Sequence, residues 1–201
     1  MSQVTLMECR GPELKPWIDA LGEVRIRVFR DYPYLYDGSL DYEREYLRTY
    51  LNSPRSLVVL ALEGESVVGA TTCIPLADEG QEFQRPFLDH GYDIDSICYF
   101  GESILLPRHR GQGVGVAFFE RREAHAQRLG GMRITTFCAV DRPDDHPRRP
   151  SDHESLDGFW TRRGYTRHPE LRTEFIWKEI DEPTESPKSL TFWLKNWPET
   201  C

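Results

Sequence analysis

RGQGVG, at residues 110–115, is the stretch that decides the fold of this chain. The nearly apolar segment 97–106 precedes it, and a segment of helical periodicity follows it and ends before Gly130 and Gly131. Glycines at alternate positions let the backbone approach a ligand closely and point successive N–H groups the same way. Where such a turn begins a helix, these N–H groups and the helix dipole favour a phosphate. The stretch therefore predicts a strand, a phosphate-binding turn and a helix.

Three phosphate-binding patterns compete for this turn. A Walker loop requires Gly-Lys-Ser/Thr, whereas Val116 and Ala117 stand in that region. A dinucleotide fingerprint requires G-x-G-x-x-G, and Val116 replaces its third glycine. The pattern R-x-x-G-x-G is matched at every required position by Arg110, Gly113 and Gly115. The third pattern is therefore favoured.

The order of elements along the chain predicts a mixed α/β domain. Helical periodicity covers 13–30 and 39–51, with shorter helices at 81–91 and 156–163. The segments that read as strands are 4–9, 56–62, 66–74, 97–106, 132–140, 172–179 and 189–195. This order describes a mixed sheet with helices on both faces. With 201 residues and no linker-like stretch, residues 1–201 are expected to form one domain.

The R-x-x-G-x-G turn, in this place, resembles the GNAT superfamily of acetyl-CoA-dependent N-acyltransferases. The segment FWTRRGY, residues 159–165, looks like a later segment of that family, and the order of elements is similar to the family's. The resemblance implies a central, mostly antiparallel sheet that splays at its fourth and fifth strands. It also implies acetyl-CoA as co-substrate, with its pyrophosphate in the turn and its pantetheine arm along the preceding strand. The residues implied are Arg110, Gly111, Gln112, Gly113, Val114 and Gly115 for the pyrophosphate, and Ile104, Leu105 and Leu106 for the arm.

Two positions depart from the family pattern. His153 stands where the family often has Asn, and Trp160 stands where it often has a Tyr that protonates the leaving thiolate. An indole is a donor that does not titrate, so this role does not transfer to Trp160. Tyr165, which ends the same segment, is the remaining candidate for that role, and packing in the core is the alternative for its side chain.

Glu102 is the candidate general base. An amine must lose a proton before it attacks a thioester, and a carboxylate can take that proton. Glu102 lies in the apolar segment 97–106, where its pKa should be raised and where the resemblance places such a base. The alternative is a structural glutamate that a nearby arginine satisfies.

The connection between the first two helices is the candidate acceptor site. It is rich in tyrosine and acidic residues, which suit a cationic or amine-bearing ligand, and the family usually recognises its acceptor there. We expect Tyr32, Tyr34 and Tyr36 to contact the acceptor, with anchoring of the loop to the core as the alternative.

Composition excludes several classes of function. The net charge is −8 and the acidic excess lies in the first half, which argues against nucleic acid as a partner. No apolar run approaches ~20 residues and the N-terminus lacks a signal-peptide pattern, so we expect no membrane partner and a cytoplasmic location. The 5 cysteines form no CxxC pair and the histidines no HExxH motif, so neither a disulfide framework nor a metal site is expected.

The sequence thus predicts an N-acetyltransferase that moves acetyl from acetyl-CoA to a primary amine. The alternative is a non-catalytic acyl-CoA-binding sensor or partner-binding module that kept the turn and lost turnover. The aromatic segment 191–197 adds an expectation about assembly. Alternation puts Phe192 and Leu194 on one face and Trp193 on the other, where an exposed indole would favour a homodimer.

Overall fold

Eight strands and five α-helices build the part of the chain that the structure, a computed structural model, describes, residues 4–198. Cys201 lies outside the described residues. The strands are β1 (Thr5–Cys9), β2 (Leu57–Glu63), β3 (Ser66–Pro75), β4 (Ile97–Tyr99), β5 (Ser103–Leu105), β6 (Ile134–Val140), β7 (Thr166–Trp177) and β8 (Ser186–Asn196). The helices are α1 (Ile18–Phe29), α2 (Leu40–Asn52), α3 (Gln81–Asp89), α4 (Val114–Leu129) and α5 (Asp157–Thr161).

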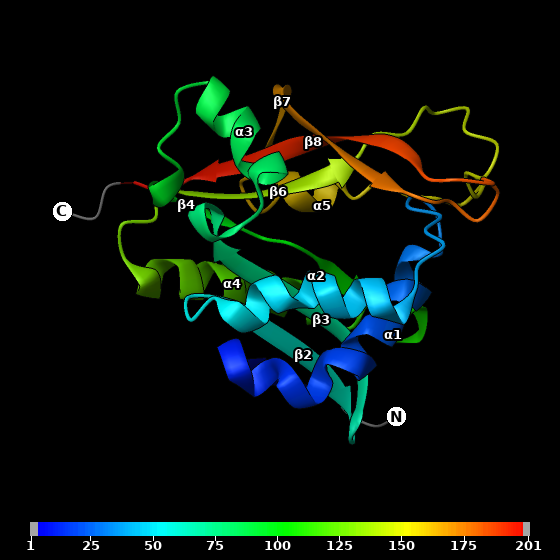
Figure 1. The fold of residues 1–201 in the computed structure, drawn as a ribbon, viewed down its shortest axis with the longest axis horizontal. Coiled ribbons are helices and arrows are strands. Elements are labelled where there is room, and N and C mark those ends of the chain that lie inside the picture. Colours follow the sequence, from blue (N-terminus) through cyan, green and yellow to red (C-terminus); the bar gives the residue numbers. More distant parts are fainter. Residues whose placement is uncertain (1–3, 199–201) are drawn as a thin grey trace.

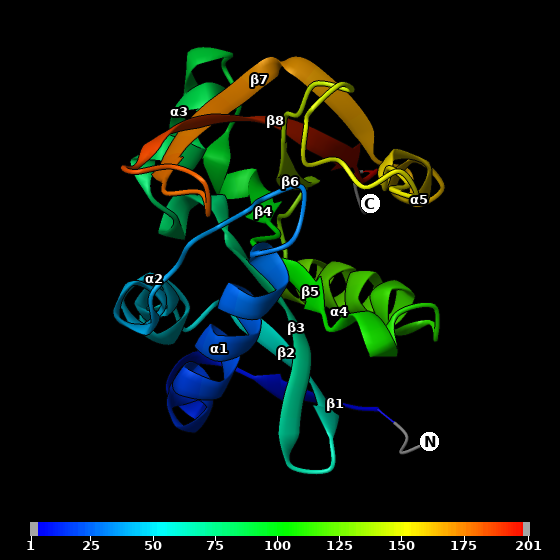
Figure 2. The same ribbon diagram turned by 90° about the vertical axis from the view of Figure 1, so that its right-hand side faces the viewer.

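The strands form one mixed sheet in the order β1-β2-β3-β4-β6-β8-β7, with β5 paired to β3 beside this path. The named pairs are antiparallel except β4–β6, which is parallel. Figures 1 and 2 show α1 and α2 on one side of β2 and β3, and α4 on the other. The predicted mixed sheet with helices on both faces is therefore confirmed.

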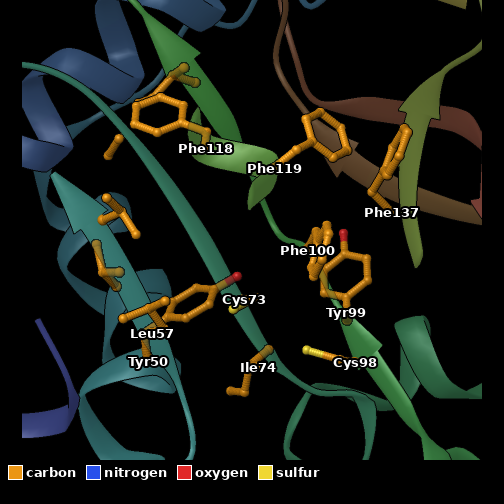
Figure 3. Close-up of a cluster of buried hydrophobic side chains, with 14 of the residues drawn as sticks. Tyr50, Leu57, Cys73, Ile74, Cys98, Tyr99, Phe100, Phe118, Phe119 and Phe137 are labelled. Atoms are coloured by element: carbon orange, nitrogen blue, oxygen red, sulfur yellow. The ribbon is translucent and has the colours of Figure 1, made fainter. Parts of the chain in front are cut away.

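The hydrophobic core fills both sides of the sheet. Leu21 of α1 and Leu47 of α2 are completely buried on one side, and Phe118 of α4 is buried on the other. Each such side chain contributes roughly 1.5–3 kcal/mol when it leaves water. Cys73 and Cys98 lie in the same core as buried free thiols (Figure 3). The core therefore joins all the helices to the sheet that carries the site described below.

The predicted single strand 97–106 is wrong in one respect, because the structure divides it into β4 and β5. Phe100 donates its backbone N–H to Thr136 on β6, whereas Gly101 donates to Thr72 on β3. The chain therefore changes partners at this point and leaves β6, which is the splay that the resemblance implied. A side chain at Gly101 would force the buried side chain of Tyr50 to move, since its Cβ would lie 1.9 Å from the Tyr50 hydroxyl.

The predicted exposure of Trp193 is also wrong. Strand β8 is not at the edge of the sheet but lies between β6 and β7. On one face Phe192 packs against Phe87 of α3, and on the other Trp193 packs against Trp160 of α5 with ring centroids 5.1 Å apart. Only 6% of Trp193 is exposed, because both faces of this strand carry a helix. The homodimer stays a prediction without this residue as its basis.

No helix within residues 4–198 combines the length and the apolar character that crossing a membrane requires.

Candidate active site

The glycine turn lies where the sequence places it, between β5 and α4. A short 3₁₀ helix (Pro107–His109) leads into it, and Gly113 forms the N-cap of α4. Gly111 and Gly113 have φ of +74° and +82°, values that side chains rarely adopt, and the space in front of both is open. The first N–H groups of a helix have no acceptor within it. The first backbone N–H groups of α4 therefore point into open space, and this arrangement fits a phosphate.

Arg110 connects the turn to the strand before it. Its Nε donates a hydrogen bond of 3.0 Å to the carbonyl of Leu105. Gln112 donates in the same way to the carbonyl of Arg108, at 3.2 Å. Both side chains are exposed, so the unused donors of the Arg110 guanidinium remain open to a ligand. The predicted pyrophosphate site and the predicted arm site are thus one continuous structure.

Strand β5 has an edge without a strand partner among the described residues. It pairs only with β3, where Leu105 stands opposite Gly69. Leu106 donates its backbone N–H to Val68 at 2.9 Å, and the alternation of an antiparallel ladder then points the N–H and carbonyl of Leu105 away from β3. Ile104 is buried and Leu105 is half-buried. The N–H of Leu105 is therefore free, and its carbonyl, which also accepts from Arg110, keeps a second lone pair for an extended ligand on the side of the splay.

A cavity of about 450 Å³ adjoins the glycine turn between α4 and α5. Gly115 lies one residue before Val116 of its lining, and a Cβ at Gly115 would lie 3.5 Å from the ring of Phe159. The guanidinium of Arg163 lies 3.4 Å above the centroid of that ring. The lining residues are Val116, Phe119, Glu120, Glu123, Arg162, Arg163 and Lys195. Sequence reasoning did not assign these residues, although the paired arginines of FWTRRGY were a visible signal.

Glu102 lies at the break between β4 and β5, where it is 5% exposed. Its Oε2 accepts hydrogen bonds from Arg25 Nη1 of α1 and, at 3.3 Å, from the hydroxyl of Tyr46 of α2. Its Oε1 has no partner within the described residues. Burial raises the pKa of the Glu102 carboxyl, and Arg25 opposes that rise. The glutamate is thus both paired with an arginine and left with one oxygen able to accept a proton.

Tyr165 lies elsewhere, inside an aromatic cluster. It is completely buried, and its ring packs against Phe119 and Phe137 at centroid distances of 5.3 and 5.1 Å. Its hydroxyl bonds Thr135 at 2.9 Å and donates to Glu123 at 3.1 Å. Burial, and next the charge of Glu123, raise the pKa of Tyr165. The structure therefore brings Tyr165 to the α4 side of the sheet, whereas the carboxylate of Glu102 lies on the side of α1 and α2.

The three candidate acceptor tyrosines do not meet at one point. The ring of Tyr32 packs against His153, centroid to centroid 4.7 Å, and that of Tyr34 packs against Trp177 at 6.0 Å. The hydroxyl of Tyr36 is buried without a hydrogen-bond partner in the described chain. Burial, and next the charge of Glu43, raise the pKa of Tyr36. Of the three, Tyr36 is the one that the structure brings to the acidic side chains around Glu102.

Glu79 is a candidate site residue that sequence reasoning missed. It follows β3 and is 8% exposed, with one carboxylate oxygen bonded to the N–H of Gly80 and the other without a partner among residues 4–198. Burial raises the pKa of Glu79 to about 7, while the hydrogen bond from the Gly80 N–H lowers it. Nothing near it in the sequence marks Glu79 as buried, because its neighbour Tyr50 comes from α2 and Glu102 from the break between β4 and β5.

Within residues 4–198, no three His, Cys, Asp or Glu side chains lie close enough together to hold a metal ion.

Comparison with known families decides where the chain belongs. The sequence model of the acetyltransferase (GNAT) family matches residues 23–150. This chain belongs to that family. As a GNAT-family protein it is an acetyltransferase, and the predicted family and fold are confirmed. Among curated proteins, no sequence matches it.

Solved structures of other acetyltransferases share the fold. An acetyltransferase of Thermus thermophilus is 16% identical, with 97% of each chain covered and a TM-score of 0.55. The ribosomal-protein-alanine N-acetyltransferase of Brucella melitensis is 11% identical, with 96% of this chain and 99% of that one covered and a TM-score of 0.61. The yncA protein of Salmonella typhimurium, solved with its cofactor acetyl-CoA, is 13% identical, with 98% and 95% covered and a TM-score of 0.58. At these identities the likeness extends to the fold alone.

Proposed function

We propose that this GNAT-family protein transfers acetyl from acetyl-CoA to a primary amine of a small molecule or peptide. The whole chain, residues 1–201, acts as one cytoplasmic domain, and the amine attacks the thioester directly in a ternary complex. One observation carries the proposal: Glu102 keeps a free, buried carboxylate oxygen at the break where β5 leaves β6. The open glycine turn and the free edge of β5 support the part of the proposal that concerns acetyl-CoA.

The cofactor-binding residues fit a coenzyme A ester. The turn from Arg110 to Gly115 offers backbone N–H groups and a guanidinium to the pyrophosphate, which prefers such charge-assisted bonds. The Leu105 carbonyl, which accepts from Arg110 and has a second lone pair, offers an acceptor to the amide groups of the arm. When bound, acetyl-CoA supplies a thioester whose carbonyl carbon accepts the amine nitrogen while the carbon–sulfur bond breaks.

Glu102 acts as the base. An alkylammonium of pKa ~10.4 is neutral in about one molecule in 2,500 at pH 7, a handicap of roughly 4–5 kcal/mol. Glu102 accepts one of the two protons that the amine loses, and the second ends on the departing sulfur. The raised pKa of Glu102 brings its basicity closer to that of the amine. The N–H of Leu105 is the donor best placed to stabilise the oxygen of the reacting carbonyl.

A non-catalytic acyl-CoA-binding module remains the second candidate, and the position of Tyr165 favours it. The hydroxyl of Tyr165 is engaged with Thr135 and Glu123, so it offers no free proton to a leaving thiolate. Thiol release from acetyl-CoA, measured over a panel of amines, separates the two candidates. Release that depends on an amine supports the enzyme, whereas calorimetric binding of acetyl-CoA without release on any amine supports the module.

A further inference from the structure

Four buried oxygen atoms on the side of α1 and α2 have no hydrogen-bond partner among residues 4–198. They are the hydroxyl of Tyr36 and the Oε1 atoms of Glu43, Glu79 and Glu102. The three glutamates are each less than a tenth exposed. A buried acceptor without a donor is costly, and most native structures avoid it. The Tyr36 hydroxyl is itself a donor, and Glu43 is the acceptor beside it. The oxygens of Glu79 and Glu102 are therefore the two suited to a ligand that brings N–H donors.

Two tyrosine hydroxyls join these glutamates into one cluster. Tyr46 donates to Glu102 at 3.3 Å, and the hydroxyls of Tyr46 and Tyr50 lie 3.3 Å apart. Burial raises the pKa of Tyr50, and the nearby charges of Tyr46, Glu79 and Glu102 add to that rise. We call Tyr36, Glu43, Glu79 and Glu102, with Tyr46 and Tyr50, the carboxylate cluster. It adjoins the break at residues 100–102, since Gly101 lies against the hydroxyl of Tyr50.

The carboxylate cluster has more carboxyl groups than its one cation can pair with. Arg25 lies between two of the glutamates and forms ion pairs with both Glu43 and Glu102. Glu79 forms no ion pair within the described chain, and its neighbours are the N–H of Gly80 and the Tyr50 hydroxyl. Three carboxylates therefore face one guanidinium. Buried carboxylates are stable in their charged form only when cations pair with them.

We infer that the carboxylate cluster binds an acceptor with two cationic nitrogen atoms, one at Glu102 and the other at Glu79. This inference rests on the proposed function and names its class of acceptor, a diamine or an equivalent dication. Once Glu102 has taken the proton of the reacting amine, Arg25 pairs with Glu43 and the second ammonium pairs with Glu79. Each remaining charge then has one partner, which a monoamine does not achieve. Glu79 is the residue that selects the acceptor, and Glu102 is the base.

The test compares two acceptors of equal chain length, 1,4-diaminobutane and n-butylamine, by thiol release. We expect the wild-type protein to prefer the diamine by tenfold or more in kcat/KM. Glu79→Gln should reduce that preference by tenfold or more, and Glu79→Asp should restore part of it. Glu82→Gln, which changes a nearby carboxylate on α3 outside the cluster, is the matched control and should keep the preference.

Calorimetric titration of 1,4-diaminobutane, with coenzyme A present, gives a readout that needs no turnover. Binding that is at least tenfold tighter than that of n-butylamine, and that Glu79→Gln weakens while circular dichroism stays unchanged, supports the inference. A wild-type protein that acetylates or binds the two amines equally well overturns it. So does a preference that Glu79→Gln leaves intact. If no amine, these two included, caused thiol release, that result would instead contradict the proposed enzyme. The titration would then decide whether the carboxylate cluster binds the diamine.

Discussion

Arg122 of α4 donates a hydrogen bond of 3.3 Å to the backbone carbonyl of Glu102. Arg25 reaches the carboxylate of the same residue from α1, on the other side of the sheet. Arg122 is 2% exposed and lies 4.3 Å from the ring centroid of Phe100, and it has no carboxylate partner in the described chain. One buried guanidinium thus holds the backbone carbonyl of Glu102 and another holds its carboxylate, and we propose that Arg122 positions this glutamate.

Arg122→Met should lower the activity without lowering the stability of the protein. A buried cation without a carboxylate contributes little net stability, so an apolar side chain of similar size should leave the free energy of unfolding unchanged or raise it. The Glu102 carbonyl loses a donor, and we expect amine-dependent thiol release to fall roughly tenfold, about 1.4 kcal/mol in the barrier. Chemical denaturation and steady-state kinetics measure the two effects. Arg121→Met, on the exposed face of α4, is the control, and equal activity of the two variants would remove Arg122 from the site.

Gly113→Val should abolish binding of acetyl-CoA. Its Cβ would occupy the open space where we place the pyrophosphate. Gly91→Val is a matched control, because Gly91 has a similar φ of +75° and open space but lies far from the turn in sequence. Calorimetry on both variants separates lost binding from backbone strain. If Gly113→Val bound acetyl-CoA as tightly as Gly91→Val does, the turn would not be the phosphate site.

Glu102→Gln should lower the rate of amine acetylation by about 100-fold or more while acetyl-CoA affinity changes little. The acidic limb of the pH profile of kcat/KM should flatten, since that limb reports the ionisation of the base in the free enzyme. Glu43→Gln, which changes the other partner of Arg25, should keep the limb. If the acidic limb were unchanged in Glu102→Gln, another carboxylate would be the base, and Glu79 would be the next residue to test.

Glu79 should make the protein less stable as the pH rises. Its pKa of about 7 exceeds its ordinary value of 4.5, so the folded state holds a proton that the unfolded state releases between those values. The free energy of unfolding should fall across this window, by on the order of 3 kcal/mol for a shift of this size. The groups that face Glu79 are the Gly80 N–H, Tyr50 of α2, Glu102 at the break and Glu82 of α3. Urea denaturation from pH 4 to pH 8 should show the fall in wild-type protein and a smaller fall in Glu79→Gln, in which the raised pKa of Glu102 still contributes.

Trp193→Ala should destabilise the monomer rather than dissociate a dimer. Trp193 is buried between Phe137 and Trp160, so truncation should cost about 3–5 kcal/mol of the free energy of unfolding. The homodimer is tested separately by light scattering at micromolar concentration. A mass twice the 23.5 kDa of one chain would support it, and a mass equal to one chain would refute it.

Local patterns were enough to predict the turn and most elements. Three alternating glycines before a helical segment leave few options, and the hairpin around Gly64 follows from two β-branched runs. Partnerships across long separations could not be predicted. Arg25 and Glu102 are 77 positions apart, and no local pattern states that α1 delivers a guanidinium to the break. Trp193 shows the same limit, because alternation gives the two faces of a strand but not the helix that covers each.

The change of partners at residues 100–102 leaves an open seam inside an otherwise continuous sheet. Strand β5 continues along β3 while β6 runs on beside β8, so hydrogen-bonding groups such as those of Leu105 face a gap between two halves of one ladder. Unpaired strand edges accept any extended chain that carries amide groups. An extended arm bound there would act as an inserted strand, and the sheet would be complete only while the ligand is present. Binding and closing the sheet would then be the same event.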